Sequence, residues 1–456
     1  MLKKKLITLL ALLLCGSMPL NAQTVVKVDP ATVRGLVKPM NAANNGPTDV
    51  TMAGYKDLRI PFARTHDTPL GTEYGGHCID INQIFPDFDA NVDSPKSYDF
   101  TMSDLVLKDM LEAGTEPFFR LGQSIEHQEK KYGIYPPKNY RKWARICEHI
   151  IRHYNEGWAG GFRFGIRYWE IWNEPDLDQP EERWKTDPRT WGGTMEQFYE
   201  LYGTAAKHLK KCFPDLKIGG PAFANPRKYG PDFLDYVKAK DIPLDFFSWH
   251  MYHRKPARIV EDVRIVRNLL DEKGFEKTES ILNEWNYNRS WEEAPHYYSR
   301  RVRPTIKGAA FVAAVMCDCQ DESVDMLMYY DLHPNTIWCG PFEPFVHERR
   351  PPFWALYYWA ELADYGTQVE SSCDTDGIYT CAAIDKDGNK ARLLVVRYHE
   401  NDEIKTLCDT GINVPEGWQI TRIRLTDSRG MDRETETSPT ITLESNAFAL
   451  IELERN

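Results

Sequence analysis

The feature that most constrains the fold is a regular alternation of short apolar segments and longer amphipathic segments through residues 34–363. The short segments have the length of buried strands, and the longer ones space their apolar residues as one face of a helix does. Eight such β–α units in one chain predict an α/β fold, the (β/α)8 or TIM barrel. The predicted strands are residues 34–44, 58–66, 115–122, 166–174, 216–224, 244–252, 280–286 and 325–332, and the predicted helices include residues 101–113, 140–154, 195–212, 231–240, 259–273 and 303–318.

A doubly wound open sheet is the alternative arrangement of the same elements. Such a sheet usually carries a glycine-rich phosphate-binding turn after its first strand. The sequence contains no such turn and no other cofactor motif, so the barrel is favoured and we expect no cofactor.

The pattern changes near residue 365. Helical periodicity stops there, and short strands follow, separated by turns such as residues 386–389. Residues 365–456 therefore predict a small antiparallel β-sandwich that follows a barrel domain of residues 34–364. A short strand within residues 23–33 precedes the barrel, and we expect it to join the sandwich.

Residues 1–22 have the pattern of a secretory signal peptide. Three lysines at positions 3–5 precede an apolar stretch at residues 6–14, and a small residue before Gln23 provides a cleavage site. Lipidation at Cys15 is disfavoured because it requires a small residue before the cysteine, and a leucine stands there. We expect export to the periplasm or the extracellular space.

The cysteines do not predict a metal site. Neither a CxxC pair nor an HExxH segment occurs, so structural zinc and a zinc-protease centre are both disfavoured. His149 and His153 lie four residues apart on a predicted helix, where we expect a solvated face. Cys373 and Cys381 flank a turn-like segment and could face each other across a hairpin.

Composition excludes several partners. Lys plus Arg is 56 and Asp plus Glu is 67, a net charge of −11 without a basic block, which argues against nucleic acid. No apolar run of about 20 residues follows the N-terminus, so a multi-spanning membrane protein is excluded. The 13 Trp and 23 Tyr fit a large core, or a surface that stacks on sugar rings. The oligomeric state stays open.

Two predicted strand ends carry the same chemical feature. The fourth strand ends with Asn173-Glu174, and the seventh ends with Glu284, each beside aromatic residues. Catalytic groups of TIM barrels lie at the carboxyl ends of strands, and strands four and seven stand across the mouth from each other. Two opposed carboxyl groups are what glycoside hydrolysis needs, one protonated and one ionised. Asn173 could donate to a sugar hydroxyl.

These segments resemble glycoside hydrolase family 39, a family of retaining TIM-barrel glycosidases that includes β-xylosidases and α-L-iduronidases. The matching motifs are Trp-Asn-Glu-Pro-Asp at residues 172–176 and Glu-Trp-Asn at residues 284–286. The resemblance implies that Glu174 is the acid/base and that Glu284 is the nucleophile of a double displacement. It covers residues 34–363, and Trp285 is expected among the substrate contacts.

Other residues match the family singly. His250 and Tyr252 end the sixth strand on one face, where Tyr252 could hold Glu284 ionised and His250 could contact a hydroxyl. His66, at the end of the second strand, resembles a family sugar contact. Arg64 could pair with a catalytic carboxylate or brace the barrel through Glu170, and both readings stay open.

One departure concerns the substrate. Family xylosidases carry an acidic pair beyond an Asp after strand eight, whereas this chain has Asp331 without that pair, which indicates a preference other than simple xylosides. Trp338 and Trp291 are candidate stacking platforms. The long segment 71–98, with Tyr74, His77 and Asp80, could shape a closed subsite.

The predicted function is that of a secreted, retaining, exo-acting glycoside hydrolase that acts on plant or host glycan oligosaccharides. An endo-glycanase of the same clan is one alternative. A glycan-binding barrel without activity is another, and it would be indicated by a missing carboxylate, whereas both are present.

Overall fold

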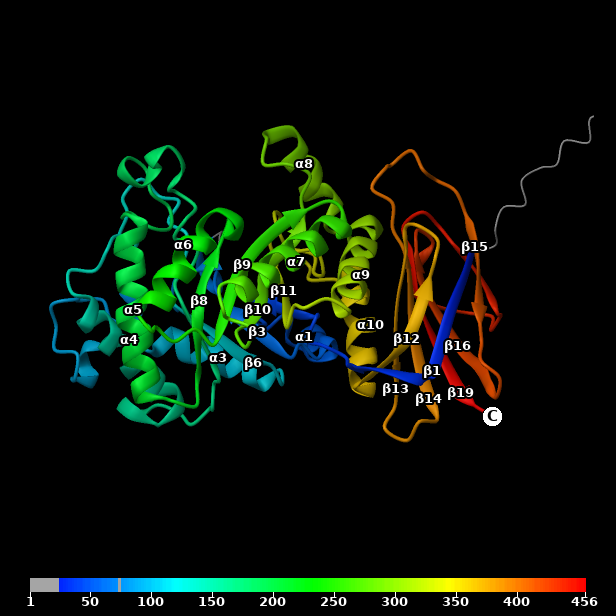
Figure 1. The fold of residues 1–456 in the computed structure, drawn as a ribbon, viewed down its shortest axis with the longest axis horizontal. Helices are drawn as coiled ribbons and strands as arrows, with labels where there is room; N and C mark the ends of the chain where they lie inside the picture. Colours follow the sequence, from blue (N-terminus) through cyan, green and yellow to red (C-terminus); the bar gives the residue numbers. More distant parts are fainter. Residues whose placement is uncertain (1–23, 73–74) are drawn as a thin grey trace, which may run out of the picture.

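The computed structural model describes residues 24–72 and 75–456. The predicted signal peptide, residues 1–22, and Tyr74 lie outside the described residues. The chain forms a closed eight-stranded barrel and a nine-stranded sheet beside it (Figure 1). The predicted fold class, a TIM barrel with a β-sandwich, is confirmed.

The barrel consists of parallel strands that close between β11 and β2. Each predicted strand overlaps one barrel strand, although the observed strands are mostly shorter. The predicted strand 34–44 also includes residues 34–36, which belong to a strand of the second sheet. Residues 58–61, for example, belong to the end of a helix and a turn that precede the second barrel strand. The barrel strands are β2 (Ala42–Asn44), β3 (Phe62–Thr65), β6 (Glu116–Leu121), β7 (Tyr168–Ile171), β8 (Lys217–Phe223), β9 (Phe246–His253), β10 (Glu279–Tyr287) and β11 (Met326–Tyr329).

Helices surround the barrel, and the predicted ones are present. The predicted helix 231–240 begins earlier, at Pro226, because the Asn225 side chain accepts a hydrogen bond from the amide of Lys228 and caps the helix there. The helices are α1 (Met52–Leu58), α2 (Ile81–Ile84), α3 (Thr101–Glu112), α4 (Tyr140–Asn155), α5 (Met195–Cys212), α6 (Pro226–Ala239), α7 (Pro256–Glu272), α8 (Glu293–Val302), α9 (Ile306–Gln320) and α10 (Pro351–Tyr365). Short additions are the hairpin β4 (Thr68–Thr72) and β5 (Gly75–Gly76), and the 3-10 turns Pro95–Ser97, Trp158–Gly160 and Pro180–Lys185.

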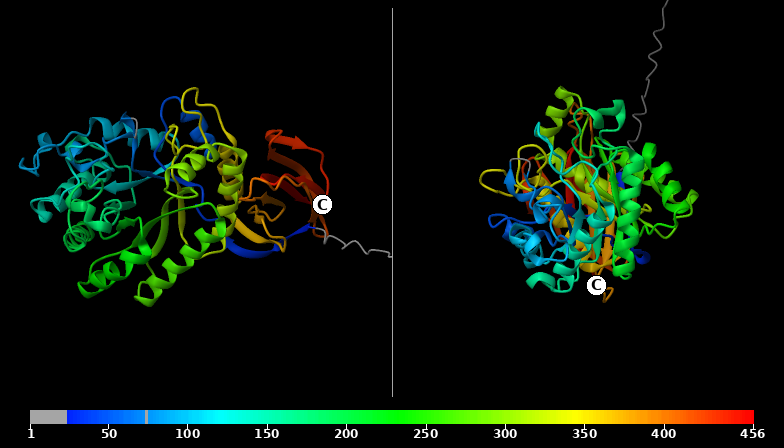
Figure 2. Two further views of the ribbon diagram at one scale, coloured as in Figure 1. Left: turned by 90° about the horizontal axis from the view of Figure 1, so that it is seen from above. Right: turned by 90° about the vertical axis from the view of Figure 1, so that its left-hand side faces the viewer.

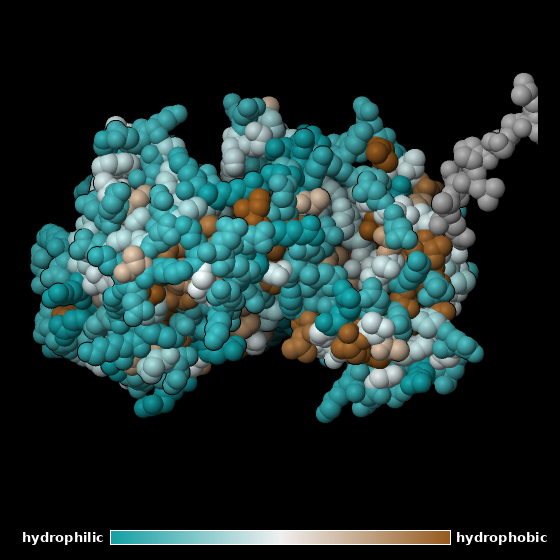
Figure 3. Space-filling model, viewed as in Figure 1, coloured by the Kyte–Doolittle hydropathy of each residue, from teal (hydrophilic) through white to brown (hydrophobic). Residues whose placement is uncertain are grey.

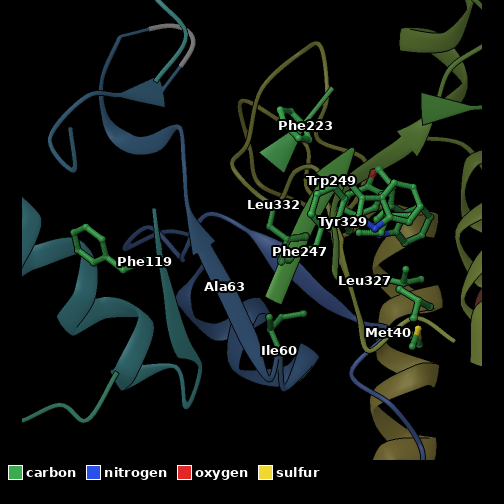
Figure 4. Packing of buried hydrophobic residues seen from close by; sticks show 14 of the residues in the cluster. Met40, Ile60, Ala63, Phe119, Phe223, Phe247, Trp249, Leu327, Tyr329 and Leu332 are labelled. Atoms are coloured by element: carbon green, nitrogen blue, oxygen red, sulfur yellow. The ribbon is translucent and has the colours of Figure 1, made fainter. Parts of the chain in front are cut away.

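The barrel strands bury both faces. Side chains that point outward, such as Ala63, Phe119, Phe247, Trp249 and Leu327, join the core against the helices (Figure 4). Side chains that point inward change character along the strands. An apolar layer fills the amino-terminal end of the barrel, and buried polar groups replace it toward the carboxyl-terminal end. The apolar layer consists of Ala42, Phe118, Tyr168, Phe246, Ile281, Met326 and Met328.

The second sheet has the strand order β17-β16-β19-β14-β13-β12-β1-β15-β18. Its pairs are antiparallel except β1 with β15, so the sheet is mixed and not purely antiparallel as predicted. The parallel pair involves β1, which precedes the barrel in the sequence and lies between β12 and β15, two strands that follow the barrel. The strands are β1 (Thr24–Leu36), β12 (Thr367–Cys373), β13 (Ile378–Ile384), β14 (Lys390–Arg397), β15 (Cys408–Asn413), β16 (Trp418–Asp427), β17 (Gly430–Thr435), β18 (Thr440–Leu443) and β19 (Ala447–Arg455).

Two smaller expectations are wrong. In the β12–β13 hairpin Val369 lies opposite Ala382, a register in which Cys373 and Cys381 do not face each other, and both thiols are free. His149 and His153 do not form a solvated helix face. Both are buried, and the ring of His153 stacks on Phe100 at 3.5 Å between centroids.

Helices α9 and α10 lie between the barrel and the sandwich (Figures 1 and 2). The ring of Phe311 on α9 contacts Trp285 and Tyr287 of barrel strand β10 on one side and Tyr398 of the sandwich on the other. The two units therefore share a buried aromatic junction. The face of the molecule in Figure 3 is mostly hydrophilic, and within residues 24–72 and 75–456 no helix has both the length and the apolar character needed to cross a membrane.

The junction makes a prediction for stability. Phe311→Ala should lower the free energy of unfolding by about 3–5 kcal/mol, because it removes a fully buried ring and leaves a cavity between the two units. Urea denaturation measures this change. Val346→Ala is the control, since this exposed side chain should contribute no more than about 0.5 kcal/mol. Equal losses of unfolding free energy in the two variants would contradict the stabilising role of Phe311 at the junction.

Candidate active site

Glu174 and Glu284 face each other at the carboxyl end of the barrel. Glu284 belongs to β10, and Glu174 follows β7 by three residues. Only 8% of Glu174 and 5% of Glu284 is exposed. One carboxylate oxygen of each lies within 4.8 Å of the other and of a ring nitrogen of His250. The sequence-predicted pair is thus brought together in one buried cluster.

Arg64, on β3, connects the groups beneath the pair. Its guanidinium donates to Glu170 Oε2 at 2.6 Å, to Glu284 Oε1 at 2.8 Å and to Asn173 Oδ1 at 2.7 Å. Both readings of Arg64 therefore hold, because it pairs with a catalytic-site carboxylate and also braces the barrel through Glu170. The second oxygen of Glu170 accepts hydrogen bonds from Ser248 and Asn283, both at 2.6 Å.

Glu284 is surrounded by donors. Besides Arg64, the hydroxyl of Tyr252 donates to Glu284 Oε2 at 2.7 Å, and His66 Nε2 lies 3.5 Å from Glu284 Oε1. Burial and the neighbouring Glu174 raise the pKa of Glu284, while Arg64 and the hydrogen bond from Tyr252 act in the opposite direction. Glu284 thus has a cation and a phenol as hydrogen-bond donors, and both favour its ionised form.

Glu174 has a different environment. Burial raises its pKa to about 7, which Arg64 and Arg189 only partly oppose. Its nearest ring partner is His250, whose Nδ1 lies 2.8 Å from Glu174 Oε1. Burial lowers the pKa of His250 to about 4, so this imidazole is neutral near pH 7. With a pKa of about 7, Glu174 carries a proton in about half of the molecules at pH 7 and in most of them at lower pH.

The backbone around Glu174 adopts a conformation that L-residues rarely use. Trp172 has φ 78° and Glu174 has φ 45°, both in the left-handed region. The amide of Glu174 donates to the carbonyl of Ala222 at 3.0 Å, and its carbonyl accepts from Thr190 Oγ1 at 2.7 Å. These bonds hold the strained turn that directs the Glu174 carboxyl group toward Glu284.

Buried polar atoms without a partner surround the two carboxyl groups. Asn173 Nδ2, His66 Nδ1 and His250 Nε2 have no hydrogen-bond partner within the described residues. Such atoms cost free energy unless a ligand or water pairs with them. All three atoms belong to residues that contact the carboxyl pair or Arg64. The site therefore suits a ligand rich in hydroxyl groups.

Aromatic rings form one rim of the site. The ring of Tyr252 lies 5.1 Å from Trp338, and Tyr330 lies 5.6 Å from Trp338. The hydroxyl of Tyr330 also donates to Asp67. Tyr330 and Asp67 were not among the predicted site residues. Asp67 directly follows the predicted strand 58–66, and Tyr330 precedes Asp331 within the predicted strand 325–332, so their positions were the available signal.

Trp285 is not a substrate contact. It is completely buried and packs against Phe311 and Tyr329 on the outer face of the barrel. Neighbouring residues of a strand point to opposite faces, so the inward direction of Glu284 sends Trp285 outward.

Two acidic residues mainly organise loops. Asp331 is buried and accepts hydrogen bonds from the amide of His333 and from Asn335 Nδ2. Asp80 accepts from Arg120 and Ser124. Both side chains therefore use their oxygens inside the protein, which reduces what they can offer to a ligand.

Two groups among residues 24–72 and 75–456 bring three metal-ligating side chains together. One is Glu174, His250 and Glu284, and the other is Glu148, His208 and Cys212 between α4 and α5. In the first group, Arg64 already donates to Glu284, and its fixed positive charge disfavours a second cation there.

The chain matches the model of glycosyl hydrolases family 39 over residues 55–335. It is 31% identical over 226 residues to a beta-xylosidase of Caldicellulosiruptor saccharolyticus, an alignment that covers 45% of this chain and 42% of the relative. It is 25% identical over 323 residues to a beta-xylosidase of Geobacillus stearothermophilus, covering 62% and 60%. The chain thus spans less than two thirds of the length of these curated relatives.

Solved structures share the fold. A glucosidase from Croceicoccus marinus superposes with a TM-score of 0.75 at 20% identity, covering 96% of this chain and 100% of that chain. A monomeric beta-xylosidase from Caulobacter crescentus gives 0.69 at 19% identity, covering 95% and 100%. Both the barrel and the accessory sheet are therefore part of a recurring architecture.

The position of Arg64 makes a prediction. Arg64→Met should lower the free energy of unfolding by about 3–5 kcal/mol, because Glu170 and Glu284 would be left buried without their cation. Arg167→Met is the control. Its guanidinium pairs with Glu116 at 2.6 Å but is exposed, so the loss should be below about 1 kcal/mol. Denaturant titration measures the free energy of unfolding of both variants. Similar losses would contradict the prediction that the buried ion pairs of Arg64 stabilise the fold more than an exposed pair does.

Proposed function

The chain belongs to glycosyl hydrolases family 39, and from this premise we propose that it is a retaining glycoside hydrolase that uses Glu174 and Glu284 in a double displacement. The observation that carries the proposal is the closeness of the two carboxyl groups, since one oxygen of Glu174 lies within 4.8 Å of one oxygen of Glu284. Retaining enzymes hold the two groups about 5–5.5 Å apart, whereas inverting enzymes need about 6.5–9.5 Å to admit a water.

In the first step, Glu174 donates its proton to the glycosidic oxygen as the leaving group departs. Glu284 attacks the anomeric carbon and forms a covalent glycosyl–enzyme ester. In the second step, Glu174, now ionised, takes a proton from water, and that water displaces Glu284 from the anomeric carbon. The two inversions together retain the anomeric configuration.

The surrounding residues support these roles. Arg64 and Tyr252 donate to Glu284 and keep it ionised for attack. Arg64 also holds Asn173, whose unpaired Nδ2 can donate to a hydroxyl of the sugar. The neutral imidazole of His250 beside Glu174 adds no charge that would remove the proton from that carboxyl group.

The stereochemical prediction is the direct test. The product first released should have the anomeric configuration of the substrate, as followed by proton NMR, and a 2-fluoro glycoside of the substrate sugar should label Glu284. Glu284→Ala should lose activity even on substrates with activated leaving groups, because the covalent path is gone. A first product of inverted configuration would reject the double displacement.

The acid/base prediction concerns pH and leaving groups. Glu174→Ala should lower kcat/KM on unactivated glycosides by about 10²–10⁴-fold and affect activated aryl glycosides far less, because only the former need protonation. Wild-type kcat/KM should fall as the pH rises through about 7, since Glu174 then loses its proton. An unchanged alkaline limb in Glu174→Gln would assign that limb to another group.

For the substrate we propose a class of glycans and not a single sugar. The two relatives described above are named beta-xylosidases, but this chain lacks an acidic pair just beyond Asp331. From this departure and the long segment 71–98 we propose exo-cleavage of glycan oligosaccharides other than simple xylosides. A panel of aryl xylosides, arabinosides, galactosides, glucosides and uronides identifies the sugar. Random cleavage of a polysaccharide would favour the endo-glycanase alternative, and binding without turnover would favour the non-catalytic one.

We also propose that the protein is exported. The support is the lysine-rich start followed by the apolar stretch at residues 6–14. N-terminal sequencing of the protein recovered from the periplasm or medium should give Gln23 as the first residue, and an N-terminus at Cys15 would instead indicate a lipoprotein.

A further inference from the structure

An exposed tryptophan lies beside the candidate active site. Trp291, in the segment that follows β10, is 64% exposed. Its ring lies 5.4 Å from that of Tyr252 and 5.9 Å from that of Trp338. Since Tyr252 also donates to Glu284, aromatic surface is continuous from the proposed nucleophile to the outside of the mouth.

The two tryptophans are held in place by their neighbours. The ring of His296 is stacked against Trp291, with centroids 5.7 Å apart and an angle of 22° between the planes. The buried guanidinium of Arg303 lies 3.8 Å from the ring centroid of Trp338. Trp291 therefore presents a pre-positioned ring, which lowers the entropy cost of binding a ligand against it.

The accessory sheet supports the same segment. Glu400, in the loop between β14 and β15, accepts hydrogen bonds from Arg289 Nε at 2.7 Å and from the hydroxyl of Tyr287 at 2.9 Å. The amide of Arg289 donates to Ser299 Oγ of α8 at 2.9 Å. The residues just before Trp291 are thus tied to both the barrel and the sandwich.

Trp291 also lines a hollow. Its other walls are Glu293, Ala294, His296, Tyr297 and Arg300 of α8. A flat apolar ring beside a carboxylate, an imidazole and a guanidinium is the combination that binds a sugar, because the ring covers its C–H face and the polar groups pair with its hydroxyls.

We propose that Trp291, together with Trp338, forms a stacking subsite for a second sugar ring, adjacent to the ring held between Glu174 and Glu284. This inference rests on the proposed glycosidase function and specifies its substrate as an oligosaccharide at least two rings long. The subsite contributes to substrate affinity and leaves the chemistry at the carboxyl pair unchanged.

The test compares two substrates of the sugar that the aryl-glycoside panel selects, its disaccharide and its glycosyl fluoride of the same anomeric configuration. The fluoride has no second ring to stack. Trp291→Ala should lower kcat/KM on the disaccharide about tenfold, mainly through KM, which corresponds to about 1.4 kcal/mol of lost binding. It should leave kcat/KM on the fluoride within about twofold.

Two further variants complete the test. Trp291→Phe keeps a ring and should restore most of the activity on the disaccharide. Phe345→Ala removes an aromatic side chain that is 79% exposed and is not part of the Trp291 ring cluster. It should therefore leave kcat/KM unchanged on both substrates.

The outcomes separate the two proposals. Equal losses on disaccharide and fluoride, or no loss on either, would overturn the stacking subsite while the glycosidase function stands. A wild-type protein that turns over none of the panel, the disaccharides or the fluorides would overturn the proposed function and the subsite with it.

Discussion

The buried ion pairs of Arg64 are the constraint on which the rest of the site depends. A guanidinium with no exposed surface is tolerated only when its charge and its donors are satisfied, and Glu170, Glu284 and Asn173 satisfy them. These partners come from strands β7 and β10 and from the turn after β7, so one cation aligns groups that are far apart in the sequence. Removing it would leave two carboxylates buried without compensation.

The same constraint explains why two chemically identical side chains differ. Glu284 receives Arg64 and Tyr252 as donors, whereas Glu174 faces neutral His250 and an environment that raises its pKa to about 7. A pair of carboxyl groups with unequal environments can supply an acid and a nucleophile at one pH. The strained turn at Glu174 places its carboxyl group across the mouth from β10.

The accessory sheet contacts the barrel strand that carries Glu284. Phe311 packs between barrel strand β10 and Tyr398. Glu400 accepts hydrogen bonds from Tyr287, at the end of β10, and from Arg289, just beyond it. Stability of the sandwich and geometry of the mouth are therefore linked through β10. Family membership explains the reaction class, while this contact is a property of these particular residues.

The sequence alone determined the barrel, its eight strand positions and the two glutamates, because strand periodicity and residue type are local properties that a pattern records. Strand alternation placed His250 and Tyr252 on one face, and the family resemblance suggested the contact of Tyr252 with Glu284. It misplaced Trp285, assigned Asp331 to the substrate and left Arg64 undecided between two roles. It did not single out Tyr330 or Asp67, and it did not show that β1 would run parallel to β15. These features depend on which distant segments meet, and only the tertiary structure decides that, because burial and charge pairing are set by neighbours that the local sequence does not contain.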